Sequence, residues 1–248
     1  MKKILIKIFS LVIILFTVLA VSSCTLGYIK NPSDVAREYN LAHESVTYKI
    51  TTKTVIKKAG FLWTNKTIKG KTTYKMDETG WYIKSKIDGE KEKIYCRASD
   101  FVTFIKEDDG WEKEDLTAFS FNDLVNSIVP EEKLLYVRLE TKDAKCKNGK
   151  WHFNVESYVM MSTNNKYREL FSEELDSDDL RTSTEIKDYI IHSSFGKITK
   201  TEVLLSHTIE DVEKGKIYTA ETRIEIEIKN IDNTKVNLPI YLYQLYDR

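Results

Sequence analysis

The sequence predicts an α+β protein built on one large curved antiparallel sheet, a half-open barrel with a few covering helices. Apolar and polar residues alternate along most of the chain after residue 46, and short turns such as Asp88-Gly89 separate the alternating runs. Helical spacing of apolar residues is confined to three places. A sheet of about ten strands with one apolar face has to curve so that this face is enclosed, or else the face stays exposed to solvent.

The N-terminus has the composition of an export signal. Lys2 and Lys3 form a basic head, an uncharged apolar run spans 8–21, and two serines precede Cys24. A basic head, an apolar centre and a small-residue cleavage site are typical of a secretory signal peptide. The run is shorter than the about 20 apolar residues that cross a bilayer, so a transmembrane anchor is the weaker alternative. An ordinary secretory signal, in which Cys24 has no role, is a second alternative.

The sequence Val21-Ser22-Ser23-Cys24 resembles the lipobox of bacterial lipoproteins. The resemblance implies cleavage before Cys24 and a diacylglycerol on its thiol. Two or more acyl chains hold a protein stably on a membrane, whereas one does not. We therefore expect a signal peptide at 1–23, a tether at 24–31 and a single domain at 32–248. The domain is then lipid-anchored on the extracytoplasmic face of the cell membrane.

The charge balance argues against a nucleic-acid partner. The chain has 38 basic and 38 acidic residues, and cleavage before Cys24 removes three lysines and no acid. The resulting small negative net charge lacks the basic excess that nucleic acids require. It also provides no general attraction to anionic lipid headgroups, although it says nothing about local patches.

The first half of the domain is expected to be a helix followed by a meander of strands. Pro32-Ser33-Asp34 starts a helix over 33–44, with Ser33 as its N-cap. The apolar period then changes from helical to two, which indicates half-buried strands. The six expected strands span 46–57, 62–76, 81–87, 94–98, 101–106 and 111–113.

The second half is expected to return to helix before it finishes as sheet. Phe121, Leu124 and Val125 have helical spacing, which predicts a helix over 119–129 with Ser120 as its cap. The remaining elements are strands at 134–140 and 150–159, a mostly helical insertion at 164–191, strands at 198–209 and 216–231, a polar exit at 233–239 and an aromatic tail at 240–248.

This layout resembles the LolA/LolB-like superfamily, in particular Gram-positive lipoproteins of the LppX/LprG kind. The features that carry the resemblance are the lipobox at Cys24, the helix at 33–44, the strand that begins at Tyr48, the helix at 119–129 after six strands, and the final strand 224–230 leading into Asn233 and Pro239. The aromatic tail and the acidic stretch near 172–179 depart from the pattern. The resemblance implies a sheet wrapped around an apolar cavity that carries acyl chains or lipoproteins.

We therefore expect an exported, membrane-anchored lipoprotein that binds a lipid or another amphiphile in a cavity of the curved sheet. The alternative is a cell-envelope interaction or assembly module with no small ligand, which the Thr/Lys-rich outer face of 46–76 favours. No nucleophile, base and orienting group stand together in the pattern, so we do not expect an enzyme. We expect a monomer without a cofactor.

Two cysteines remain after Cys24. A disulfide between Cys96 and Cys146 would persist in an exported protein and would close a loop of about 50 residues. Two separate thiols are the other interpretation, which we favour because Cys96 shares a strand face with Ile94 and Ala98 whereas Cys146 lies between lysines near a turn.

The other candidate sites are weak. The four histidines are scattered without metal-ligand spacing, which favours surface or structural roles for His43, His152, His192 and His207. Ser194 and Lys197 fit the S-x-x-K pattern without its companion motifs, so we assign them no catalytic role. The acidic stretch 176–179 lacks the glycine and terminal glutamate of an EF-hand, so we expect a solvated turn and no metal site. We expect core positions, not a ligand cage, for Phe61, Trp63, Trp81, Trp111 and Trp151.

Overall fold

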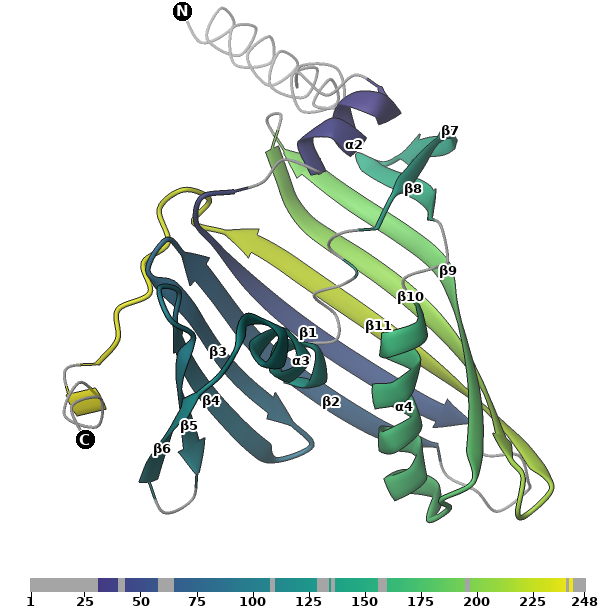
Figure 1. Ribbon diagram of the computed structural model, residues 1–248. Coiled ribbons are helices and arrows are strands. Elements are labelled where there is room, and N and C mark those ends of the chain that lie inside the picture. Colours follow the sequence, from purple (N-terminus) through teal and green to yellow (C-terminus); the bar gives the residue numbers. More distant parts are fainter. Residues whose placement is uncertain are drawn as a thin grey trace, which may run out of the picture.

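A computed structural model describes residues 31–39, 43–57, 65–107, 110–128, 134, 137–155, 160–194, 197–239 and 241–242. These residues form one antiparallel sheet of eleven strands that curves without closing, with three helices (Figure 1). The predicted fold class is therefore confirmed. The predicted signal peptide, Cys24 and the predicted tether up to residue 30 lie outside the described residues. None of the helices in the described ranges is long and apolar enough to cross a membrane.

The sheet consists of two meanders joined in the middle. Its strand order is β6-β5-β4-β3-β2-β1-β11-β10-β9-β8-β7, so the first and last strands pair at the centre. The first meander comprises β1 (Val46–Lys57), β2 (Lys66–Asp77), β3 (Gly80–Ile87), β4 (Glu90–Arg97), β5 (Val102–Glu107) and β6 (Gly110–Asp115). The second comprises β7 (Leu139–Lys147), β8 (Lys150–Val155), β9 (Leu180–Ser194), β10 (Lys197–Asp211) and β11 (Lys216–Lys229).

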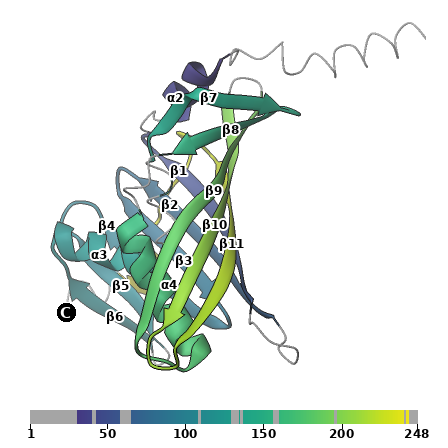
Figure 2. The ribbon, with the colours of Figure 1, turned by 90° about the vertical axis from the view of Figure 1, so that its right-hand side faces the viewer.

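Two helices lie on the inner, concave face of the sheet (Figures 1 and 2). They are α3 (Ala118–Ile128), beside the β3–β5 part, and α4 (Met160–Leu175), against β9. Because side chains alternate between the two faces of a strand, one apolar set along each strand points inward. Ile50 of β1, Val203 of β10 and Ile224 of β11 belong to this set, and each is at most 2% exposed. The core of the domain is this inner face.

The helix N-caps differ from the predicted ones. Helix α2 (Pro32–Tyr39) begins one residue earlier than expected, and the predicted end at residue 44 is wrong, since residues 43 and 44 are not helical. Oδ1 of Asn31 accepts a 2.9 Å hydrogen bond from the backbone N of Asp34. Asn31 is therefore the cap in place of Ser33, and Pro32 takes the first helical position, where it loses no hydrogen bond. For α3 the cap is Thr117, whose hydroxyl accepts from the backbone N of Ser120 at 3.1 Å.

The predicted strand at 134–140 is wrong at its start, because β7 begins only at Leu139. The backbone O of Leu134 accepts hydrogen bonds from two tyrosine side chains, Tyr39 of α2 at 3.0 Å and Tyr189 of β9 at 2.5 Å. The two hydroxyl groups also contact each other, and both rings are buried. Leu134 thus helps to attach α2 to the sheet and is not part of a strand ladder.

The mostly helical insertion predicted over 164–191 is also wrong in its second half. Helix α4 ends at Leu175, and β9 then runs through the sheet between β8 and β10. The register against β10 shifts where Leu204 faces Asp188 and Leu205 faces Ile186, so Lys187 is an extra, bulged residue. Inward positions are even-numbered before the bulge and odd-numbered after it, as buried Thr184 and Tyr189 show. This change of phase removes the alternation that would have indicated a strand.

Candidate functional site

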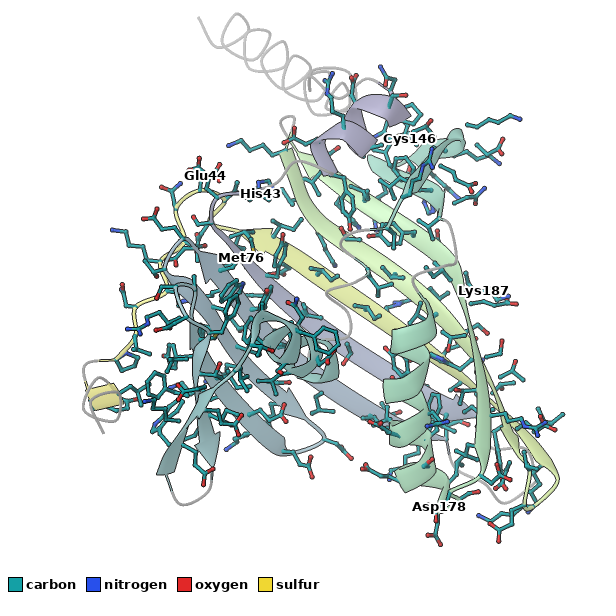
Figure 3. All side chains as sticks on the ribbon, in the orientation of Figure 1. His43, Glu44, Met76, Cys146, Asp178 and Lys187 are labelled. Carbon is teal, nitrogen blue, oxygen red and sulfur yellow. The ribbon has the colours of Figure 1, made fainter. Side chains whose placement is uncertain are left out.

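A pocket of about 580 Å³ lies at the end of the sheet where β1 begins and β2 ends. Its lining comes from the approach to β1 (Glu44, Ser45), the β2–β3 turn (Asp77, Glu78, Thr79), the end of β4 (Tyr95, Cys96, Arg97) and the C-terminal segment (Asp232 and 234–238). We use the name C-terminal segment for residues 230–239, which follow β11. Figure 3 shows Glu44 and Met76 at this end and Asp178 at the opposite end.

Asp77 holds the C-terminal segment over the pocket. Its Oδ2 accepts a hydrogen bond of 2.6 Å from the backbone N of Val236, and its Oδ1 accepts from the backbone N and the hydroxyl of Thr79 at 2.8 and 2.6 Å. The Thr79 hydroxyl also lies 3.0 Å from the backbone O of Val236. One carboxylate therefore organises the β2–β3 turn and the segment together.

A second set of hydrogen bonds attaches the start of the segment to β1. The hydroxyl of Ser45 accepts from the backbone N of Thr234 at 3.0 Å, and the backbone O of Ser45 accepts from Asp232 at 2.7 Å. The hydroxyl groups of Thr47 and Thr234 are 2.8 Å apart. These side chains are buried apart from Asp232, so both walls of the pocket have fixed positions.

The pocket is charged at its rim and apolar on one side. Four acidic and two basic residues line it, together with Tyr95, Val236 and Leu238. Burial alone would raise the pKa of Asp77, but its hydrogen bonds from Thr79, Val236 and Gly80 outweigh burial and lower this pKa. The Arg97 guanidinium is paired with Asp100.

Cys96 connects the pocket to the core. It lines the pocket, yet its side chain is 3% exposed and belongs to the main apolar cluster. In register it faces Trp81 of β3, which faces Met76 of β2 on its other side. Burial raises the pKa of the Cys96 thiol to about 11, so the group is an apolar thiol at neutral pH. The apolar side of the pocket comes instead from Tyr95 and Leu238, which pack against Val102, Phe104 and Leu242.

A row of hydrogen-bonded polar side chains crosses the inner face next to α4. Nδ1 of His207 lies 2.9 Å from the hydroxyl of Thr184, and Nε2 lies 2.9 Å from the hydroxyl of Thr222, which is 2.8 Å from that of Thr54. The imidazole packs against Tyr167 of α4 at 4.6 Å between ring centroids. Burial lowers the pKa of His207 to about 4, so the ring is neutral at pH 7.

The two cysteines of the domain lie far apart in the sheet. Cys96 is buried in β4, whereas Cys146 is exposed in β7, the strand at one edge of the sheet. The structure therefore has no disulfide between Cys96 and Cys146, and both side chains are thiols.

The other weak candidates are placed in structural positions of the outer sheet face and of a hairpin. His152 pairs with Asp188 at 3.0 Å and His192 with Glu202 at 2.9 Å, both on the outer face of the sheet. Ser194 and Lys197 face each other across the β9–β10 hairpin instead of sharing a helical turn. Within the described residues, no group of three or more His, Cys, Asp and Glu side chains could hold a metal ion.

The acidic stretch 176–179 forms the turn between α4 and β9. Asp176 has a φ of 50°, which is the left-handed conformation that commonly ends a helix. Lys214, from the β10–β11 turn, donates to the backbone O atoms of Leu175 and Asp176 at 3.0 and 2.7 Å. These contacts make the stretch part of the attachment of α4.

The predicted role of the aromatic residues as core agrees with the structure for the three tryptophans that it describes. Trp81 and Trp151 pack against the main cluster, and Trp111 packs against a second cluster formed by Val102, Phe104 and Leu242. Phe61 and Trp63 lie outside the described residues.

The pocket itself could not be predicted from local patterns. Its key acceptor, Asp77, is part of an ordinary turn sequence, and the segment it holds comes from the other end of the chain. The row of polar side chains around His207 is easier to predict from the sequence. The alternation that places Ile50 and Ile56 inward also places Thr54 inward.

No family model matches the sequence, and no curated protein matches it significantly. Among solved structures, the chain is similar to a LolA superfamily protein from Nitrosomonas europaea, with 8% identity and a TM-score of 0.28 over 84% of this chain and 93% of that one. It is also similar to a beta-barrel-like protein with a domain of unknown function from Brucella abortus, with 9% identity and a TM-score of 0.21 over 76% of this chain and 100% of that one. At these TM-scores the likeness identifies no family.

Proposed function

We propose that the protein is a membrane-anchored lipoprotein that binds an amphiphile at the end pocket. The observation that carries this proposal is a pocket of about 580 Å³ that combines charged rim residues with an apolar side, where Tyr95 and Leu238 pack against the cluster of Val102, Phe104 and Leu242. Small-molecule sites typically have volumes of about 300–1,000 Å³ and combine apolar walls with a few polar groups. The polar part of the ligand would lie among the rim residues, and its apolar part would lie toward Tyr95 and Leu238. The sequence resemblance implies acyl chains held inside the sheet, and such chains are also parts of amphiphiles.

Native mass spectrometry of the full chain, extracted in mild detergent from its own host, tests ligand binding. We expect an additional mass that denaturation releases and that fragmentation identifies as an amphiphile. Glu78→Trp places a bulky ring at the rim of the pocket, from an exposed turn position, and is expected to abolish the additional mass. Glu213→Trp makes the same change in the exposed β10–β11 turn, away from the pocket, and should leave it unchanged.

A bare chain mass in every preparation would contradict this proposal and favour the interaction module without a small ligand. An additional mass that survives Glu78→Trp would contradict the assignment of the ligand to this pocket.

Lipid anchoring at Cys24 has a separate test. Cells are grown with an alkyne-labelled fatty acid, and the label on the protein is compared between the natural chain, Cys24→Ser and Cys146→Ser. We expect the label to be lost only in Cys24→Ser, because only Cys24 follows the lipobox-like sequence, and Cys146 is the exposed-thiol control. Label that persists in Cys24→Ser, or that never appears, would contradict the anchor.

A further inference from the structure

The outer face of the four strands from β1 to β4 carries a dense group of lysines. We call Lys53, Lys69, Lys71, Lys84, Lys86 and Lys91 the lysine face; all six side chains are exposed. The register places them opposite one another: Lys53 faces Lys69, Lys71 faces Lys86, and Lys86 in turn faces Lys91. Because directly opposite residues of an antiparallel pair point to the same side, these ammonium groups form a two-dimensional array on one surface.

This arrangement opposes stability. Like charges directly opposite each other in a sheet are destabilising. Among the described residues, no ion pair involves any member of the lysine face. Since the whole chain has equal numbers of basic and acidic residues, the array is a local concentration and not the result of a basic composition. A feature that opposes stability without compensation inside the protein points to a partner outside it.

The neighbouring half of the same outer face is built differently. On β10 and β11, Lys200 pairs with Glu202 at 3.0 Å and with Glu225 at 2.9 Å. Across the β1–β11 pair, Lys57 pairs with Glu221 at 2.7 Å. The chain therefore has acidic partners for its outer lysines on β11 and lacks them from β2 to β4, where the outward residues between 67 and 75, 82 and 86, and 91 and 95 are Lys, Thr and Tyr.

Aromatic side chains border the lysine face. Lys93 Nζ lies 5.6 Å from the ring centroid of Tyr95 and 5.3 Å from that of Trp111, and Lys75 Nζ lies 5.7 Å from that of Tyr82. These rings are half-buried. Tyrosine and tryptophan beside lysine are typical of surfaces that meet the headgroup region of a bilayer, because each ring has an apolar body and a polar edge.

We propose that the lysine face, with its aromatic border, docks on the anionic phospholipid headgroups of a membrane. An array in two dimensions matches a planar surface of phosphates better than it matches a single polymer chain. All its cations are lysines, which attract phosphates as point charges, whereas recognition of one defined phosphate favours the fork of arginine. The proposal depends neither on the end pocket nor on Cys24, because the face consists of described outward side chains.

Acetylation of lysines in the full chain tests the proposal. The protein is reconstituted into vesicles of phosphatidylcholine alone or mixed with phosphatidylglycerol, and a membrane-impermeant amine reagent is applied. We expect the anionic lipid to lower the acetylation rate of the lysine face about fivefold or more. Exposed Lys147 and Lys216 are the internal references, whose rates should not change. Molar salt should remove the protection, since it shortens the Debye length to about 3 Å.

Matched variants separate docking from net charge. Replacement of Lys71, Lys86 and Lys91 by Glu should abolish the protection of Lys53, Lys69 and Lys84. Replacement of Lys142, Lys147 and Lys216 by Glu changes the net charge by the same amount at other exposed positions. This triple variant should keep the protection of the lysine face.

Equal acetylation in neutral and anionic vesicles would overturn the proposal, and this result needs no variant. Protection by soluble polyphosphate but not by anionic vesicles would also overturn it, because the partner would then be a soluble polyanion. A protected lysine face on a chain without a bound amphiphile would contradict only the proposed function of the pocket.

Discussion

The backbone N–H of Val236 donates a hydrogen bond of 2.6 Å to Oδ2 of Asp77, across 159 residues of sequence. The other carboxylate oxygen accepts from the Thr79 and Gly80 backbone N atoms at 2.8 and 3.1 Å. The turn that ends β2 and the segment that follows β11 therefore depend on the same side chain. The end pocket exists because these two parts of the chain are held together.

Asp77→Ala is expected to release the C-terminal segment while the sheet remains folded. The substitution leaves the backbone N–H groups of Val236 and Thr79 without their acceptor, which costs roughly 1–3 kcal/mol of unfolding free energy. Hydrogen exchange at Val236 should become faster, whereas exchange at Ile224 in central β11 should not. Glu78→Ala, in the same turn, is the control, since Glu78 is exposed. Unchanged exchange at Val236 in Asp77→Ala would contradict the role of this carboxylate.

The same contact should depend on pH. The pKa of Asp77 is lowered in the folded protein, so the stability from its hydrogen bonds is present above the usual carboxyl pKa of about 4. It is lost as the pH falls through the lower, folded value. Exchange at Val236, corrected for its intrinsic rate, should rise only below that usual value, and a rise already complete near neutral pH would be inconsistent with this origin.

His207 is expected to make the domain sensitive to mild acid. Its pKa is about 4 in the folded state and about 6.5 in the unfolded state, so the unfolded chain binds more protons between these values. Stability is therefore full above pH 6.5 and falls toward pH 4, by about 2 kcal/mol between pH 7 and pH 5. Denaturant unfolding at these two pH values measures the loss.

His207→Gln is the matched variant for this measurement, because an amide can still bond to the hydroxyl groups of Thr184 and Thr222. The pH-dependent loss should be smaller in the variant by about 2 kcal/mol. If both proteins lose the same free energy, the buried imidazole is not the responsible group.

Charge reversal at two outer lysines should change stability in opposite directions. Lys86→Glu converts two like-charge pairs, with Lys71 and Lys91, into attractive ones and should raise the unfolding free energy by roughly 0.2–1 kcal/mol per pair. Lys200→Glu places a carboxylate beside Glu202 and Glu225 and should lower it. Denaturant midpoints at low salt measure both effects, and both should shrink at high salt. A loss of stability in Lys86→Glu would contradict the repulsion.

Lys214 is expected to be important for the attachment of α4. Its ammonium group donates to the backbone O atoms of Leu175 and Asp176 and lies 3.6 Å from Oδ2 of Asp211. Lys214→Ala removes hydrogen bonds from a charged donor, with an expected loss of roughly 1–3 kcal/mol. Hydrogen exchange near the end of α4 should become faster.

Lys216→Ala provides the comparison for Lys214→Ala, because Lys216 is an exposed lysine of the same hairpin. Equal effects of the two substitutions would show that the contacts with α4 contribute nothing specific.

Much of the first meander could be predicted from the sequence, because its strands alternate strictly and its turns carry clear signals. The Asp88-Gly89 turn has φ values of 45° and 106°, which glycine and aspartate tolerate best. The alternation also placed Cys96 correctly on the inner face. Local patterns were sufficient here because neighbouring strands are also neighbours in sequence.

The elements that could not be predicted from the sequence depend on contacts between distant parts of the chain, which no local pattern contains. In β9, the bulge at Lys187 changes the inward phase within one strand, so neither half is long enough to be recognised. At Leu134, an apolar residue looked like the start of a strand but provides a backbone acceptor for Tyr39 and Tyr189. The lysine array was visible as a Thr/Lys-rich stretch, but only the register shows that lysine faces lysine.

The position of β11 in the sheet has a consequence for the order of folding. The last strand lies between the first strand and β10, so the pairing of β1 with β11 joins the two meanders of the described sheet. Each meander has mostly local contacts, whereas the pairing of Tyr48 with Ile228 spans nearly the whole domain and closes slowly. While the chain folds, β1 and β10 therefore expose unpaired, apolar-faced edges until β11 has paired with both of them. The centre of the sheet is therefore the last part of the domain to be protected from aggregation.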